Sequence, residues 1–215
     1  MFESLFYPKV VAVIGASRTP GKLGHQVLLN LVECGFKEVI IPVNPNANEI
    51  LNLKCYANLK SHSGKINHSV IVVPVSKVKD AVLDSISAGA GTITIITAGF
   101  KESGPEGAEL ETEITRICLF AGVRLLGPNS LGFMNTDNGF NASASRSRPL
   151  AGGISIMSQS GALCTAILDW ASERRIGIAK FASLGNKADL NEIDFLTALA
   201  ADEETKVIGG YLETI

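Results

Sequence analysis

The sequence predicts an α/β fold: a Rossmann-like, doubly wound parallel sheet followed by a second, smaller α/β unit. Five short runs rich in β-branched residues are apolar throughout, which is typical of parallel strands covered on both faces. Between them, apolar residues recur at helical spacing in segments that end near glycine. The expected strands cover residues 10–15, 38–44, 68–75, 92–99 and 123–129, and the expected helices cover 22–35, 76–91 and 105–122.

A change of composition divides the chain. Residues 135–152 are small and polar and carry glycine and proline, so we expect an ordered linker between a first domain at 1–134 and a second at 153–215. In the second domain the alternation of strand and helix restarts and predicts three parallel strands. Because this unit stops on an apolar strand with no helix behind it, we expect a truncated domain of a longer polypeptide. Its expected strands are 153–158, 177–185 and 206–215, with helices at 161–175 and 191–202.

Composition limits the classes of partner. A net charge of −2 in 215 residues gives no general attraction to nucleic acid or to anionic membranes. The N-terminus lacks a signal peptide, and no apolar run approaches the ~20 residues that span a bilayer. We therefore expect a cytoplasmic protein without nucleic-acid or membrane partners.

Neither the cysteines nor the histidines predict a metal site. The four cysteines form no CxxC pair. The histidines His25, His62 and His68 have no carboxylate or cysteine at ligand spacing, and each is expected at the surface or partly packed.

A glycine-rich turn follows the first expected strand. Gly15, at the strand end, and Gly21 and Gly24, near the helix start, can bring backbone N–H groups close to an anion. The turn is not a Walker A loop, because five residues separate Gly15 from Gly21 and Lys22 is followed by Leu23. The alternative that remains at this point is a turn that serves helix–strand packing alone.

The same turn does not fit the NAD fingerprint. Ser17 stands where that fingerprint has its second glycine, and the second strand ends in Val43-Asn44-Pro45 instead of an acidic residue. Arg18 and Lys22 favour a ligand richer in phosphate than NAD. Coenzyme A, with a 3′-phosphate and a pyrophosphate, fits this description.

Six motifs make the resemblance to a known family specific. They occur in the order VAVIGAS, IPVNP, IVVPV, ITIITAGF, LLGPNSLGFMN and SIMSQSGALCTAILDWA. Together they resemble the CoA-binding and first ligase domains of NDP-forming acyl-CoA synthetases, above all the ADP-forming acetyl-CoA synthetase type, with succinyl-CoA synthetase alpha subunits more distant. The resemblance implies a Rossmann-like CoA-binding domain followed by the first part of a succinyl-CoA-ligase-like, flavodoxin-like domain.

The resemblance also implies a set of CoA-binding residues, to which the turn analysis adds Gly15 and Lys22. The residues implied to surround the CoA phosphates are Ser17, Arg18, Thr19 and Pro20. Those implied to form the adenine slot are Val43, Asn44, Pro45, Pro74 and Val75, and those implied to line the pantetheine arm are Ile96, Thr97 and Ala98. Since this sequence lacks the lysine that succinyl relatives have after the second strand, Arg18 or Lys77 is expected to contact the 3′-phosphate.

In the second domain, Ser158, Ser160 and Gly161 join a strand to a helix whose N-terminus favours an anion. In the family this helix start holds the phosphate of a phosphohistidine, and Glu213 aligns with the glutamate that orients the histidine ring. The implied cycle converts acyl-CoA and phosphate to acyl phosphate and CoA, passes the phosphoryl group to histidine, and then to ADP. None of the three histidines matches the family's histidine, so we expect this chain to bind CoA without completing turnover.

The resemblance implies further partners. ATP or ADP and Mg²⁺ are expected only through an ATP-grasp domain or beta subunit, and association into an oligomer is expected. Thr165 stands where succinyl-type enzymes have tyrosine, which favours a shorter carboxylic acid than succinate. The alternatives are a CoA-sensing or acyl-CoA-sensing module of a protein acetyltransferase, a non-catalytic CoA-binding protein, and an NAD-dependent oxidoreductase, which Ser17 disfavours.

Overall fold

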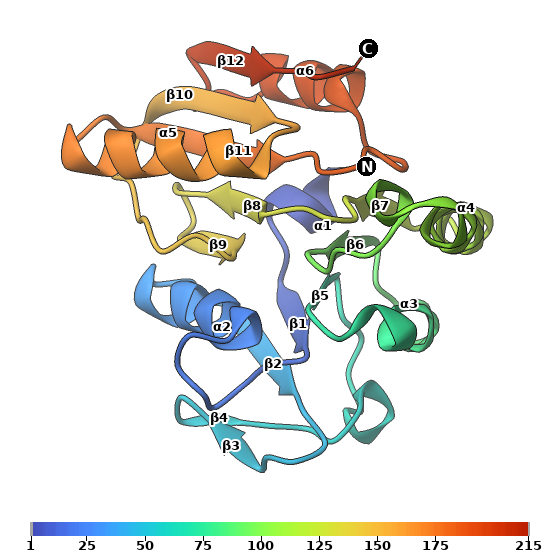
Figure 1. The fold of residues 1–215 in the computed structure, drawn as a ribbon. Coiled ribbons are helices and arrows are strands. Elements are labelled where there is room, and N and C mark those ends of the chain that lie inside the picture. The colour runs from blue at the N-terminus through green and yellow to red at the C-terminus, as the bar shows by residue number, and fades with distance from the viewer. Residues whose placement is uncertain (1, 215) are drawn as a thin grey trace.

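A computed structural model describes residues 2–214 as two five-stranded sheets, one above the other in Figure 1. The first sheet is parallel throughout, with the order β2-β1-β5-β6-β7, and confirms the five expected strands. Its strands are β1 (Val10–Ile14), β2 (Val39–Val43), β5 (His68–Ile71), β6 (Thr92–Ile95) and β7 (Arg124–Leu126). β1 lies between β2 and β5, and the chain runs from β1 to β2 on one side and then crosses to β5 on the other, which makes the carboxyl ends of β1 and β5 the switch point where open sheets bind ligands.

Alternate side chains of β1 enter two different cores, as the two faces of a strand require. Val11 and Val13 pack with α2 (Leu23–Glu33) on one face. Ala12 and Ile14 pack on the other face with α3 (Val78–Ser87) and α4 (Pro105–Phe120). The short elements around this sheet are α1 (Glu3–Phe6), the hairpin of β3 (Glu49–Ile50) and β4 (Leu53–Lys54), η1 (Leu59–Ser61), η2 (Val75–Lys77) and η3 (Lys101–Ser103).

The second sheet contains the three expected strands, which run parallel, and two further strands that were not expected, so it is mixed and has five strands. Its order is β12-β10-β11-β8-β9, in which β8 and β9 form an antiparallel hairpin against β11. The strands are β8 (Gly132–Asn135), β9 (Phe140–Ser143), β10 (Ala151–Ser158), β11 (Ile178–Ser183) and β12 (Val207–Tyr211), with helices α5 (Gly161–Glu173) and α6 (Glu192–Ala200). The expected linker, residues 135–152, therefore contains β9, which is too short and polar to show a strand period.

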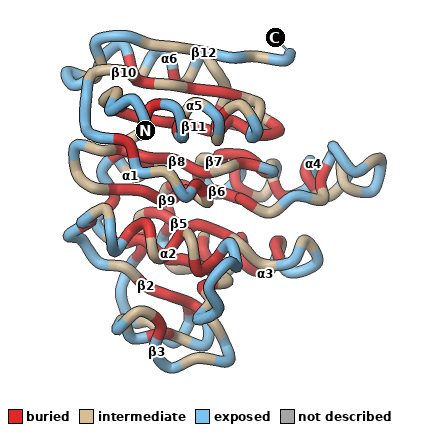
Figure 2. Tube along the Cα trace, turned by 60° about the vertical axis from the view of Figure 1, so that its left-hand side comes forward, coloured by how far each residue is buried: buried red, intermediate tan, exposed pale blue. Residues whose placement is uncertain are grey.

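The two sheets share one apolar core. Phe6 of α1 stacks on Phe133 of β8 with ring centroids 5.0 Å apart, and Phe195 of α6 and Phe140 of β9 lie in the same cluster. Figure 2 shows buried chain through β5, β6 and β8 in the middle of the molecule. Asn30 of α2 also links the two sheets through hydrogen bonds. Its amide donates to the carbonyl oxygens of Ser143 (2.9 Å) and Ser145 (2.7 Å), at and after the end of β9. The loops of the two sheets are thus held in a fixed relation.

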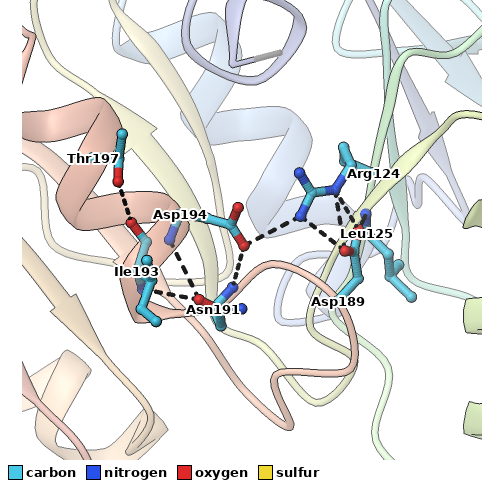
Figure 3. A network of polar contacts seen from close by, with 7 residues as sticks. All are labelled: Arg124, Leu125, Asp189, Asn191, Ile193, Asp194 and Thr197. Atoms are coloured by element: carbon cyan, nitrogen blue, oxygen red, sulfur yellow. Dashed lines mark hydrogen bonds and ion pairs between the residues drawn. The ribbon is translucent and has the colours of Figure 1, made fainter.

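A buried ion-pair network joins the sheets at β7 (Figure 3). The Arg124 guanidinium donates to both carboxylate oxygens of Asp189, whose Oδ2 also accepts the N–H of Leu125 at 2.8 Å. Arg124 also bonds Asp194, which closes a capping box with Asn191 at the start of α6. One arginine thereby fixes the segment before α6 against the first sheet.

His68 contradicts the expectation that each histidine lies at the surface or partly packed. It is fully buried in β5, where Nε2 lies 3.1 Å from Thr94 Oγ1 and the ring meets Phe140 of β9 edge-on. Burial lowers the pKa of His68 to about 3, so the ring is neutral in the folded protein near neutral pH. The strand that covers it comes from the segment expected to be a linker.

Candidate functional site

The carboxyl ends of the first sheet bring together the loops with the predicted CoA residues. The N–H of Gly15 donates to Val43 O at 3.0 Å, which ties the loop after β1 to the end of β2. Thr97 Oγ1 donates to Val73 O at 2.7 Å, which ties the loop after β6 to that after β5. The loops after β1, β2, β5 and β6 therefore lie along the same edge of the sheet, on both sides of the switch point.

The turn after β1 requires glycine for steric reasons. Gly15 has φ +93°, and a Cβ there would lie 2.6 Å from Val72 O in the neighbouring loop. A Cβ at Gly24 would overlap the carbonyl oxygen of Gly15. The start of α2 consequently packs directly on the end of β1, and the intervening residues 16–22 form the loop beside this contact.

Side chains within the turn shape its backbone. Ser17 Oγ accepts the N–H of Thr19 at 3.1 Å, and the buried His25 places Nδ1 2.9 Å from the carbonyl oxygen of Ser17. Thr19 and Pro20 are exposed. Sequence reasoning missed His25 as a support of this loop, although its place one turn into the helix after the glycines was a usable signal.

The charge of this loop suits an anion. Arg18 and Lys22 are exposed, and the first turn of α2 carries neither an acidic residue nor a side-chain cap. Arg18 Nη2 donates to Asn46 O at 3.1 Å, so the guanidinium lies over the loop that follows β2. Lys77, the other candidate for the 3′-phosphate, is exposed in η2. Three cations and an open helix start thus face solvent at the switch point.

The residues predicted to contact the adenine and the pantetheine arm differ in how far they are exposed to solvent. The side chains of Val43 and Ile96 are buried in the cores, so only their backbone can face a ligand. Asn44 is engaged within its loop, where its amide donates to Ala16 O at 2.6 Å and its Oδ1 accepts the N–H of Asn46. The predicted residues that present more surface are Pro45, Pro74 and Ala98, which are exposed, and Val75 and Thr97, which are partly exposed.

The start of α5 is a second candidate anion site. Ser160 is its N-cap and accepts the N–H of Leu163 at 3.3 Å. Ser158 is buried, and its hydroxyl accepts the N–H of Ser160 and donates to the carbonyl oxygen of Ser160. Gly161 is exposed, with open space where a Cβ would stand. Both hydroxyls therefore shape the turn, and the exposed helix start at Gly161 is left to face a ligand.

Glu213 lies beside this helix start. It is exposed and follows β12, and its backbone N–H donates to Gln159 Oε1 at 2.8 Å. Lys187, from the loop after β11, donates to the carbonyl oxygen of Thr214 at 2.7 Å. Sequence reasoning placed Gln159 in the turn before α5 without its contact to Glu213, and it did not identify Lys187, because these contacts span 54 and 27 residues of chain and leave no local pattern.

The described residues contain neither a candidate metal site nor a helix that could span a membrane. Between residues 2 and 214, no group of three or more His, Cys, Asp or Glu is arranged to hold a metal ion. Within the same range, no helix combines the length and the apolar character needed to cross a bilayer.

Models of two known protein families match this chain. A family model described as "CoA binding domain" matches residues 9–136, which is more than half of the chain. The chain belongs to this family. A second model, described as "Succinyl-CoA ligase like flavodoxin domain", matches residues 151–215. The two matches occur in the order that the six motifs implied.

Relatives with curated names extend the comparison over the whole chain. An ADP-forming acetate–CoA ligase I from Archaeoglobus fulgidus is 44% identical over 99% of this chain and 31% of its own length. The alpha subunit of the ADP-forming acetate–CoA ligase I from Pyrococcus furiosus is 37% identical over 99% of this chain and 47% of its own length. These matches confirm the resemblance to the NDP-forming acyl-CoA synthetases.

A solved structure agrees in fold. The dinucleotide forming acetyl-coenzyme A synthetase 1 of Ca. Korarchaeum cryptofilum, in complex with phosphate and ADP, superimposes with a TM-score of 0.96 at 41% identity. The match covers 100% of this chain and 46% of that chain. The chain thus spans about a third to a half of the length of the relatives it matches.

Proposed function

We propose that this chain is the CoA-binding portion of an ADP-forming acid–CoA ligase, which interconverts acyl-CoA, ADP and phosphate with carboxylate, CoA and ATP. The observation that carries the proposal is the presence, in one chain, of two helix starts that could hold an anion. Those of α2 and α5 each follow a parallel strand and have no acidic residue in the first turn. The identity of 44% to an ADP-forming acetate–CoA ligase supports the reaction class.

CoA is assigned to the edge of the first sheet. Ser17, Arg18 and Thr19 would hold the pyrophosphate on backbone N–H groups before the start of α2, and Pro20, which has no N–H, would pack beside it. Arg18 would take the 3′-phosphate, because its guanidinium already lies over the loop after β2. The exposed rings of Pro45 and Pro74 would enclose the adenine, and Thr97 and Ala98 would line the pantetheine arm. Bound CoA supplies the thiol that carries the acyl group as a thioester.

Phosphate is assigned to the start of α5. There a phosphate oxygen attacks the thioester carbonyl, the C–S bond breaks, and the CoA thiolate leaves with an acyl phosphate as the other product. The N–H groups at Gly161 would stabilise the negative charge of the phosphate. In the next step the phosphoryl group passes to a histidine outside this chain, which the Glu213 carboxylate would orient by accepting its ring N–H.

The remaining steps require a partner. ATP or ADP and Mg²⁺ are assigned to an ATP-grasp domain or beta subunit, in keeping with Pyrococcus furiosus relatives that are named as alpha subunits. We place this assembly in the cytoplasm and expect it to be oligomeric. The chain alone is expected to bind CoA and to give no acyl-CoA synthesis.

The acyl substrate is proposed to be a short carboxylic acid. Thr165 is partly buried in the first turns of α5, where its hydroxyl donates to Gly161 O at 3.2 Å. Relatives at 36% and 35% identity are named 4-hydroxybutyrate–CoA ligase and trans-feruloyl-CoA synthase, so acids of several sizes occur among related proteins. The relatives at 44% identity are named acetate–CoA ligases, which supports a short acid.

Calorimetric titration of the chain with CoA and with NAD tests the binding assignment. We expect CoA to bind and NAD to give no heat at the same concentration, because no acidic residue ends β2 to hold the ribose hydroxyls. Tighter binding of NAD than of CoA would contradict the proposal.

A further inference from the structure

The last described residues are held by a glutamine at the start of α5. Gln159 Oε1 accepts the N–H groups of Glu213 at 2.8 Å and Thr214 at 3.1 Å. Its Nε2 donates to Thr214 Oγ1 at 3.2 Å, and its own N–H donates to Tyr211 O. One residue next to the proposed phosphate site therefore makes four hydrogen bonds to the chain around Glu213.

A lysine holds the same residues from the other side. Lys187 Nζ donates to Thr214 O at 2.7 Å and pairs with Glu192 at 2.8 Å. The side chains of Lys187 and Glu192 are only 11% and 12% exposed, so water weakens this pair less than it weakens a surface pair. The ion pair fixes the ammonium group at the carbonyl oxygen of Thr214.

The backbone of Lys187 is held as firmly as its side chain. Its φ of +54° is a left-handed conformation that a non-glycine residue adopts at a cost. The preceding Asn186 donates to Glu102 at 2.6 Å and to Glu111 at 2.7 Å, which anchors the loop to the first domain. The surrounding contacts thus impose a costly conformation that directs Lys187 at the end of β12.

These contacts matter because little else holds Glu213. Glu213 and Thr214 are exposed, and β12 is an edge strand whose residues are mostly exposed. Resting on the proposed function, we infer that Gln159 and Lys187 are positioning residues: they hold the Glu213 carboxylate beside the start of α5, where it orients the phosphoryl-accepting histidine. Neither residue touches the reacting atoms itself.

Phosphorylation of the full-length protein tests the inference. Acetyl-CoA and ³²P-labelled phosphate are supplied, and the rate of protein phosphorylation is measured for Lys187→Met, Glu213→Gln and the double variant. We expect Lys187→Met to be about 10- to 100-fold slower, as for a small displacement of a catalytic group. The double variant is expected to be no slower than Glu213→Gln, because both changes remove the same function. The affinity for CoA stays unchanged.

Further variants separate positioning from loss of structure. Lys187→Arg is expected to keep most of the rate, Gln159→Ala to reproduce the pattern of Lys187→Met, and Lys79→Met, at an exposed ion pair of the first domain, to behave as wild type. A wild-type rate for both Lys187→Met and Gln159→Ala, or losses that multiply in the double variant, would overturn the inference. A wild-type rate for Glu213→Gln would instead refute the role given to Glu213 in the proposed function, and the positioning with it.

Discussion

Replacement of Arg124 by methionine is expected to destabilise the chain by about 3 kcal/mol, because it leaves a buried carboxylate without its cation. The side chain of Asp189 is 7% exposed. In the native structure it receives the Arg124 guanidinium at 2.9 Å and the N–H of Leu125 at 2.8 Å. Methionine keeps the apolar length of the side chain and removes the charge.

The magnitude follows from burial. Removal of one partner from a buried ion pair costs about 3–5 kcal/mol. Arg124 and Asp194 retain 19% and 23% exposure, so water can partly replace the lost contact and the lower end applies. In a chain of this size, about 3 kcal/mol corresponds to a fall in melting temperature of about 6–12 °C.

Urea unfolding followed by circular dichroism measures the effect. The control is Lys9→Met, because the Lys9–Glu38 pair is 70% and 42% exposed and its loss is expected to cost less than about 1 kcal/mol. The double variant Arg124→Met/Asp189→Asn is expected to be more stable than Arg124→Met alone, since asparagine carries no charge and its amide oxygen can still accept the N–H of Leu125. Equal stability of Arg124→Met and wild type would refute the reasoning.

Three further outcomes are expected. Gly24→Ala should abolish CoA binding in a titration and lower the melting temperature, because its Cβ would overlap Gly15 O; unchanged CoA binding would show that the turn is irrelevant to the ligand. Arg18→Ala should weaken CoA binding roughly tenfold and leave dephospho-CoA binding unchanged, as for one lost charge-assisted hydrogen bond; equal losses for both ligands would remove Arg18 from the 3′-phosphate. Because burial lowers the pKa of His68 from 6.5 to about 3, the unfolded chain binds a proton in this window that the folded chain does not. Stability contributed by His68 is therefore complete above pH 6.5 and falls by up to about 1.4 kcal/mol per pH unit below it. His68→Leu should flatten this slope in urea unfolding at pH 7 and pH 5, and an unchanged slope would contradict the assignment.

The first sheet could be predicted from sequence because its strands are buried on both faces. Each is a continuous apolar run, and the helices between them show their period without knowledge of the rest of the chain. The hairpin of β8 and β9 could not be predicted in the same way. Phe140 is buried because it packs with residues of α2 and against His68 of β5. The neighbouring Ser143 donates its N–H and its hydroxyl to Asn141 Oδ1. The burial of His68 depends on that same unpredicted contact.

The residues of the candidate site likewise include some that could be predicted from the sequence and others that could not. Gly15 and Gly24 could be identified from sequence, because glycine spacing records the close approach of strand and helix. The contacts of Lys187 with Thr214 and of Arg124 with Asp189 join residues 27 and 65 positions apart. Such pairs follow from tertiary packing and leave no period or motif in the sequence. Residues that hold the loops of a site in place are therefore harder to predict than the loops themselves.

A structure of the chain with CoA bound tests the central claim most directly. The account predicts the pyrophosphate within hydrogen-bonding distance of backbone N–H groups in residues 17–19, with the Arg18 guanidinium on the 3′-phosphate. CoA held elsewhere on the molecule, with this turn in contact only with water, would contradict it.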